Sequence, residues 1–129
     1  MIEAGVLLYQ ITGDRTYLTD AQKTASGTYQ YFTTVESTAE GRIVFYPDTP
    51  WFNAILFRGL KALYIVDGNK KYIQSMLENA HFAWSNTADE HNLLGKDWRK
   101  KSTQPYKWLL DNACMIELFA GLGDITKIK

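Results

Sequence analysis

The chain has 129 residues, 46% of them hydrophobic, which is enough for one core that buries about two-thirds of the unfolded chain's surface. Its 14 basic residues balance its 14 acidic ones, so no overall field attracts nucleic acid or an anionic membrane. No apolar run reaches membrane-spanning length, and the residues after Met1 lack a signal-peptide pattern. We therefore expect one domain without a nucleic-acid partner or a membrane span, and the sequence leaves its compartment open.

The first predicted helix begins at or before Met1 and ends near Gly13. It has little polar face, so we expect it to be buried on all sides. Glycine fits the position after a helix because it readily adopts the left-handed conformation that often ends one. A second helix follows, with apolar side chains at positions 18, 21, 25, 29 and 32. This spacing predicts an outer helix with a single apolar stripe.

A long connection from Thr33 to Pro50 separates this helical hairpin from the next. Within it, the alternating stretch Arg42-Ile43-Val44-Phe45-Tyr46 is prone to form a β-strand and allows a short β-hairpin. The second helical hairpin then repeats the first. A mostly apolar helix starts at Trp51 and stops at Gly68, and an amphipathic helix has apolar side chains at positions 73, 76, 80 and 84.

A second long connection, from Ala88 to Lys107, leads to a third apolar helix that we expect to end near Gly123. The glycines at the three helix ends follow one another at intervals of 55 residues. They share one motif: Leu8-Tyr9-x-x-x-Gly13-Asp14, Leu63-Tyr64-x-x-x-Gly68-Asn69 and Leu118-Phe119-x-x-x-Gly123-Asp124. The sequence therefore predicts an all-α fold of tandem helical hairpins, a single partial domain over residues 1–129 with three repeats of period 55.

The two long connections are where we expect a functional site, because the turns within each hairpin are only a few residues long. Aromatic rings stack on the apolar faces of sugars while polar groups bond the hydroxyls, and both kinds of residue occur here. The candidate substrate-binding residues are Asp48, Trp51, Phe52, Arg58, Trp98, Tyr106 and Asp111. The alternative is that Trp51, Phe52 and Trp108 only anchor the connections to the helices.

Other reactive or charged side chains receive structural interpretations. Arg58 lies inside an otherwise apolar helix, so we expect a buried ion pair with Asp111 or Asp48, with direct sugar contact as the alternative. His81 and His91 lack metal-ligand spacing, and we expect neither a metal nor a cofactor. The single cysteine, Cys114, is expected in the core, and Arg99-Lys100-Lys101 is expected to be a solvated loop rather than a nucleic-acid site.

Three stretches resemble the C-terminal part of glycoside hydrolase family 76. They are Met1 to Asp14 with Tyr17-Leu18, then Phe52-x-x-Ile55-x-x-Arg58, and Leu109-Leu110-Asp111, so the resemblance runs along almost the whole chain. It implies an (α/α) barrel of six hairpins, of which this chain forms part. It also implies that the relatives are endo-acting α-1,6-mannanases or transglycosylases, and that their substrate is an α-mannan-type polysaccharide or oligosaccharide. For the full-length protein it suggests a secreted, periplasmic or cell-surface location.

The resemblance places the family's catalytic residues, a tandem Asp-Asp, on an earlier hairpin, and no Asp-Asp occurs in this sequence. The adjacent acids Asp89-Glu90 are expected to be a solvated pair at a helix end. A retaining glycosidase needs two carboxyls roughly 5 Å apart, and nothing brings a second acid to Asp48 or Asp111. We assign no catalytic residue and expect the chain alone to be inactive. A non-catalytic helical-repeat module that binds a glycan or a protein is the alternative.

Part of a barrel leaves the flanks of its inner helices bare, and large apolar patches rarely stay exposed on a monomer. We therefore expect a homodimer or oligomer formed through the helices from Met1 to Ile11 and from Trp108 to Leu122. Val6, Leu7 and Phe119 are the expected contacts.

Overall fold

The computed structural model describes residues 1–47 and 49–127, so the candidate residue Asp48 lies outside the described residues. The helices are α1 (Ile2–Thr12), α2 (Arg15–Tyr31), α3 (Pro50–Asp67), α4 (Lys71–Thr87) and α5 (Leu109–Lys127), and the strands are β1 (Thr34–Thr38) and β2 (Gly41–Phe45). None of the helices in these ranges is both long and apolar enough to cross a membrane.

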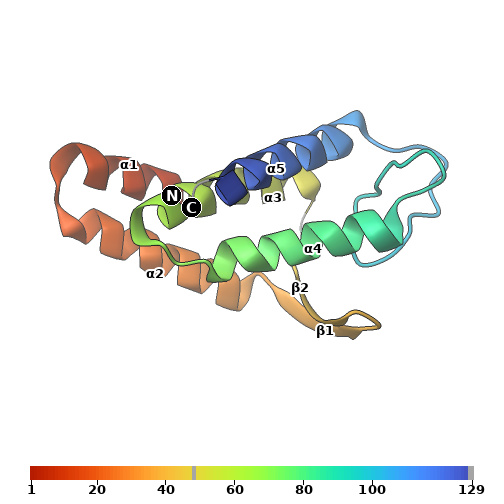
Figure 1. The fold of residues 1–129 in the computed structure, drawn as a ribbon, viewed down its shortest axis with the longest axis horizontal. Coiled ribbons are helices and arrows are strands. Elements are labelled where there is room, and N and C mark those ends of the chain that lie inside the picture. The colour runs from red at the N-terminus through yellow and green to blue at the C-terminus, as the bar shows by residue number, and fades with distance from the viewer. Residues whose placement is uncertain (48, 128–129) are drawn as a thin grey trace.

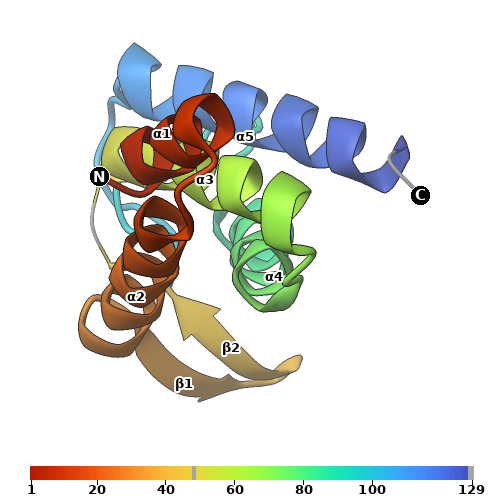
Figure 2. The same cartoon turned by 90° about the vertical axis from the view of Figure 1, so that its left-hand side faces the viewer.

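The helices form two layers. Helices α1, α3 and α5 make up one layer, and α2 and α4 pack against it (Figure 1). Helix α3 is central because it contacts each of the other four helices. Seen end-on, α2 and α4 lie beneath the first layer, with the β-hairpin below them (Figure 2). This is the predicted arrangement of inner and outer helices in tandem hairpins.

The first two predicted helix ends are confirmed. Gly13 and Gly68 follow α1 and α3 in the left-handed conformation, with φ of 72° and 70°. Each donates its backbone N–H to a carbonyl four residues earlier, on Tyr9 and Tyr64, at 2.8 Å. Asp14 then caps α2 by accepting the N–H of Thr16 at 2.9 Å. The tight turn between hairpin helices is therefore built mainly from local interactions.

The predicted helix end near Gly123 is wrong, because α5 continues through this glycine to Lys127. A glycine inside a helix costs about 1 kcal/mol relative to alanine. Tertiary contacts offset this cost, since Leu122 and Ile125 are both buried in the main core. Lys61 on α3 also pairs with Asp124 at 3.3 Å. The same motif therefore ends two helices and lies inside the third.

The expectation that the inner helices are buried on all sides is also wrong. Leu7 is 50% exposed and Ile11 80%, and apolar side chains of α3 and α5 are exposed as well. The reason is that α2 and α4 cover only one side of the inner layer in the described part of the chain. Val6 faces that covered side and is 1% exposed, so it is a core residue and not a surface contact.

The β-prone stretch in the first connection does form a strand. Strand β2 pairs antiparallel with β1, with Thr34 opposite Phe45 and Thr38 opposite Gly41. The sequence analysis did not identify β1, whose side chains are mostly exposed and so lack an apolar pattern. Phe45 packs edge-on against Phe82 of α4 with ring centroids 5.2 Å apart. The hairpin is thereby attached to the outer layer.

Tyr46 fixes the path of the chain from the hairpin into α3. Its backbone N–H donates to Oδ1 of Asn79 at 3.1 Å, and its carbonyl accepts from the Asn53 amide at 3.1 Å. Its hydroxyl bonds the hydroxyl of Ser75 at 2.7 Å, and burial raises the pKa of Tyr46 to about 12. These buried bonds hold the start of α3, and with it Trp51, in one position.

Candidate functional site

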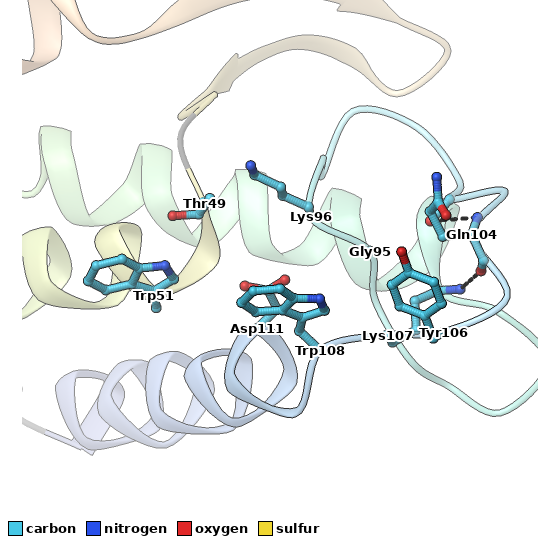
Figure 3. A pocket seen from close by; sticks show the side chains of 10 residues that line it. Thr49, Trp51, Gly95, Lys96, Gln104, Tyr106, Lys107, Trp108 and Asp111 are labelled. Atoms are coloured by element: carbon cyan, nitrogen blue, oxygen red, sulfur yellow. Dashed lines mark hydrogen bonds between the residues drawn. The ribbon is translucent and has the colours of Figure 1, made fainter.

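A pocket of about 240 Å³ lies at the N-terminal ends of α3 and α5, where the connection from Ala88 to Lys107 meets them (Figure 3). The sequence analysis expected a functional site in these long connections. The lining comes from both connections and both helix starts: Thr49, Trp51, Gly95, Lys96, Ser102, Gln104, Tyr106, Lys107, Trp108 and Asp111.

Helix α5 and the core hold the wall of this pocket in place. The backbone N–H of Leu94 donates to the Asn112 side chain at 2.8 Å, and the Asn112 amide donates back to the Leu94 carbonyl at 3.2 Å. Trp98 is only 4% exposed and belongs to the main core. A Cβ on Gly95 would lie 2.4 Å from the Cβ of Ser102, so only glycine lets these two segments of the connection approach this closely.

Lys107 and Asp89 tie the two ends of the second connection together. Their charged groups are 3.5 Å apart, and the Lys107 ammonium also donates to the Gln104 carbonyl at 2.7 Å. Asp89 accepts the N–H groups of Leu93 and His91, and the bond from Leu93 is the main cause of its lowered pKa. The expectation of a solvated acidic pair is therefore wrong for Asp89, which organises the loop.

Arg99 links the same connection to the β-hairpin. It makes a forked pair with Asp97 at 2.9 and 3.0 Å, and approaches Glu36 of β1 at 3.5 Å. The Arg99 guanidinium holds the pKa of Asp97 below its ordinary value. These ion pairs give Arg99 a structural partner on each side, whereas Lys100 and Lys101 are exposed as expected.

Asp111, in the first turn of α5, is the unusual polar residue of the pocket. It is 6% exposed, yet its carboxyl forms no hydrogen bond or ion pair within the described part of the chain. Burial raises the pKa of Asp111, and the charge of Lys96 partly opposes this. A buried carboxyl without a bonding partner is costly, and such groups are concentrated at functional sites.

Aromatic rings surround this carboxyl. Trp51 and Tyr106 lie toward opposite ends of the pocket in Figure 3, with Asp111 and Trp108 between them. Trp108 is 61% exposed and Tyr106 65%, so both rings are open to a ligand. Trp51 stacks on Phe52 with ring centroids 3.6 Å apart. A carboxyl acceptor beside exposed rings can bind the hydroxyls of a sugar and stack on its apolar face.

The structure thus brings three of the candidate residues, Trp51, Tyr106 and Asp111, into one pocket. Phe52 lines a different hollow, on the side of α2. Trp98 lies in the core beneath the loop rather than on the pocket surface. The remaining described candidate, Arg58, is absent from the described lining of this pocket.

The prediction that Arg58 pairs with Asp111 or Asp48 is wrong. Its Nε and Nη2 donate to the two carboxylate oxygens of Glu117 on α5, the second at 2.9 Å, and Asp111 takes no part. The Arg58 side chain is also 55% exposed, so this is a surface pair. Two turns along α3 from its start, Arg58 lies beside the middle of α5 rather than beside its first turn.

The sequence analysis did not select several lining residues: Thr49, Gly95, Lys96, Ser102, Gln104, Lys107 and Trp108. For Trp108 a signal was present. It lies three residues before Asp111, a spacing that puts two side chains on the same face of a helix start. The loop residues carried no such signal, because their position depends on the anchors at Leu94 and Trp98.

Metal-binding chemistry has no support among residues 1–47 and 49–127. No three His, Cys, Asp or Glu side chains gather there in a way that could hold a metal ion. Cys114 is buried, and burial raises the pKa of its thiol, which disfavours the nucleophilic thiolate.

The family model described as glycosyl hydrolase family 76 matches residues 1–123. A family 76 mannosidase from Bacteroides thetaiotaomicron is similar in structure, with a TM-score of 0.87 and 29% identity over 98% of this chain and 36% of that one. An α-1,6-mannanase from a Salegentibacter species gives 0.67 and 27%, over 94% of this chain and 38% of that one. No curated protein sequence matches the chain.

A family 76 hydrolase from a bovine Bacteroides thetaiotaomicron strain shares the fold with a TM-score of 0.89, at 24% identity over 98% of this chain and 28% of that one. The chain therefore spans about a third of the length of these solved structures. Because the family model covers nearly every residue and the helical layers superpose, the chain belongs to glycosyl hydrolase family 76 and forms part of its (α/α) barrel of six hairpins.

Proposed function

We propose that this chain forms one wall of the glycan-binding cleft of a hydrolase that acts on α-mannan. The observation that carries the proposal is the buried, unpaired carboxyl of Asp111 beside the exposed ring of Trp108. The mannosidase and α-1,6-mannanase named among the similar structures support mannan as the substrate class.

In this proposal each side chain has a defined task. Asp111 accepts hydrogen bonds from sugar hydroxyls, and these bonds supply the partners that the protein does not provide. Trp108 and Tyr106 stack on the C–H faces of the sugar rings. Gln104 and Lys96 offer further donors at the pocket wall. The buried Trp98 and the paired Arg58 support the site without touching the glycan.

The same pocket argues against hydrolysis by this chain alone. Asp111 is the only carboxyl among the described residues that line it, whereas a retaining glycosidase needs two carboxyls roughly 5 Å apart. The sequence contains no Asp-Asp pair. We propose that the catalytic acids belong to another part of the barrel.

The proposal is tested by titrating the chain with an α-1,6-linked mannotetraose and measuring the heat of binding by calorimetry. Trp108→Ala and Asp111→Asn should each weaken binding by about tenfold or more, which corresponds to ~1.4 kcal/mol. Trp84→Ala is the matched control, because this exposed ring on α4 does not line the pocket. The affinity of this variant for mannotetraose should equal that of the native chain.

The chain should release no reducing ends from α-1,6-mannan. Native affinity in both pocket variants would overturn the binding assignment. Turnover that disappears in Asp111→Asn would show instead that the chemistry takes place in this pocket.

We further propose that the isolated chain associates with itself through the exposed sides of α1 and α5. Leu7 and Ile11 on α1, and Leu109 and Ile116 on α5, are all at least half exposed. Sedimentation at micromolar concentration should show a dimer or larger species, and the double variant Leu7→Lys with Ile116→Lys should be monomeric. A native chain that sediments as a monomer contradicts the proposal.

A further inference from the structure

Two opposite charges line the candidate pocket without pairing with each other. Asp111 comes from the first turn of α5, and Lys96 extends from the second connection (Figure 3). Asp111 is 6% exposed, whereas Lys96 is exposed. Neither the carboxyl nor the ammonium forms a hydrogen bond or an ion pair within the described part of the chain. Both charged groups are therefore free to bind a ligand in the same cavity.

The other cation of the lining already has partners. Nζ of Lys107 lies 3.5 Å from the Asp89 carboxylate and donates to the Gln104 carbonyl at 2.7 Å. The Lys107 side chain is also only 8% exposed. Lys96 is thus the only cation without a partner, and Asp111 the only carboxyl, among the described residues that line the pocket. One free charge of each sign gives the pocket no net preference for an anion or a cation.

The separation of these two charges suits a single bridging atom. Burial raises the pKa of Asp111, and the charge of Lys96 opposes this shift although the two groups form no ion pair. Opposite charges influence a pKa in this way over about 4–6 Å. Two hydrogen bonds of about 2.8 Å each, joined at one oxygen atom, cover the same span.

A group that both donates and accepts hydrogen bonds can complete such a bridge. An ionised carboxylate only accepts hydrogen bonds, and a lysine ammonium only donates them. A hydroxyl donates its proton to the carboxylate and accepts from the ammonium, and the two bonds strengthen each other. A carboxylate on a sugar has no proton for Asp111, and an ammonium on a sugar has no lone pair for Lys96.

The second connection holds the backbone of Lys96 beside the pocket. Leu94, two residues earlier, is bonded to the Asn112 side chain through both its N–H and its carbonyl. Trp98, two residues later, is buried in the main core. The cavity of about 240 Å³ is smaller than the ~300–1,000 Å³ of pockets for drug-sized ligands, so it suits one sugar ring.

We propose that Lys96 is a specificity-determining residue, an inference that rests on the glycan-binding function proposed above. One hydroxyl of a bound sugar ring donates to the Asp111 carboxylate and accepts a hydrogen bond from the Lys96 ammonium. Lys96 thereby makes binding depend on that one hydroxyl, which has to be free.

The test compares methyl α-mannoside with its 2-deoxy, 3-deoxy and 4-deoxy analogues, and affinities are measured by ligand-observed NMR titration. In the native chain, one deoxy analogue should bind about fivefold or more weakly than methyl α-mannoside. Lys96→Met removes the charge and keeps a long side chain, so it should weaken methyl α-mannoside binding by about fivefold. The same variant should weaken the sensitive deoxy analogue by less than about twofold, because the shared hydroxyl is already missing.

Lys101→Met is the matched control, because Lys101 is an exposed lysine of the same connection that does not line the pocket. This variant should bind all four sugars as the native chain does. Since Lys96 is exposed, Lys96→Met should keep the native Tm to within about 2 °C.

Native affinity for all four sugars in Lys96→Met would overturn the inference. So would equal affinity of the native chain for the four sugars, or an equal loss for all four in Lys96→Met, because Lys96 would then only support the pocket wall. These results leave the proposed function intact as long as Trp108→Ala still weakens mannotetraose binding. A native chain that binds neither methyl α-mannoside nor mannotetraose would overturn the proposed function, and this inference with it.

Discussion

The two ends of the helical layers are built in different ways. At the turn end, Gly13 and Gly68 reverse the chain within a few residues, and their N–H groups donate to carbonyls in the last turn of the preceding helix. At the connection end, a loop from Ala88 to Lys107 depends on distant partners: Asn112 holds Leu94, and the core holds Trp98. The first end is locally determined, and the second depends on the tertiary structure.

The difference also concerns polar groups. The carboxyl that opens α2 at the turn end, Asp14, accepts a backbone N–H, which lowers its pKa. The carboxyl in the first turn of α5, Asp111, is buried without such a bond, and its pKa is raised. One carboxyl stabilises the scaffold, whereas the other is buried at a cost in stability, and we propose that it binds a ligand. Four changes test this contrast.

The largest expected effect comes from Trp98→Ala at the connection end. Removing a large ring that is 4% exposed should destabilise the chain by about 3–5 kcal/mol, measured by urea denaturation, and glycan affinity should fall because the pocket wall loses its anchor. Trp84→Ala, at an exposed ring, should cost under about 1 kcal/mol. Lost affinity with native stability would mean that Trp98 contacts the sugar directly.

The second change compares two glycines of the repeat. Gly68→Ala forces alanine into a left-handed conformation and should cost about 1–2 kcal/mol. Gly123→Ala lies inside α5 with no atom within 4 Å of the added Cβ, so it should stabilise by up to about 1 kcal/mol. Neither should alter glycan affinity. Equal destabilisation by both would show that Gly123 ends a helix after all.

These two glycines also show what the sequence could predict. Gly13 and Gly68 were predictable because a helix end depends on residues close in the chain. Gly123 has the same motif, yet buried Ile125 and the ion pair of Asp124 extend its helix. The sequence contained no local sign of either contact.

The site divides in the same way. The sequence could predict that Trp51, Tyr106 and Asp111 lie near one another, because they flank the two long connections at the starts of inner helices. Their role in sugar binding stays a prediction. The burial of Trp98 was not predictable, nor were the partners of Asp89 and Arg58, because each depends on how the second connection and α5 pack. The burial of the inner helices was predicted wrongly for another reason. Their apolar composition does not show which helices this chain places against them.

The third change, Asp111→Asn, should weaken glycan binding yet stabilise the unbound chain at pH 7 by up to ~1 kcal/mol. The folded pKa of Asp111 is raised above the ordinary value of 3.8, so the folded chain holds the proton more tightly than the unfolded chain. Stability therefore falls as pH rises through that raised pKa, and the penalty is absent below 3.8. The increase in the free energy of unfolding caused by Asp111→Asn, measured by urea denaturation, should disappear at pH 3. A gain that is equal at both pH values would show another cause.

The smallest expected effect concerns Arg58 and Glu117, an ion pair that joins α3 to α5 below the pocket. Glu117 has a folded pKa lowered from 4.5 by the Arg58 guanidinium. Its contribution to stability is therefore fully present above 4.5 and is lost as pH falls through the lowered folded pKa. The side chains are 55% and 41% exposed, so solvent screening limits the pair to about 0.5 kcal/mol.

Glu117→Gln should accordingly lower the free energy of unfolding by about 0.5 kcal/mol at pH 7 and low salt, and by less in 1 M NaCl. As pH falls through the lowered pKa of Glu117, the difference in stability between the variant and the native chain should disappear. Glu90→Gln is the control, because its carboxyl lies on an exposed loop. Glycan affinity should remain native in both variants, since neither side chain lines the pocket. A tenfold loss of affinity in Glu117→Gln would extend the glycan site along α5, and the pair could no longer be assigned to the scaffold alone.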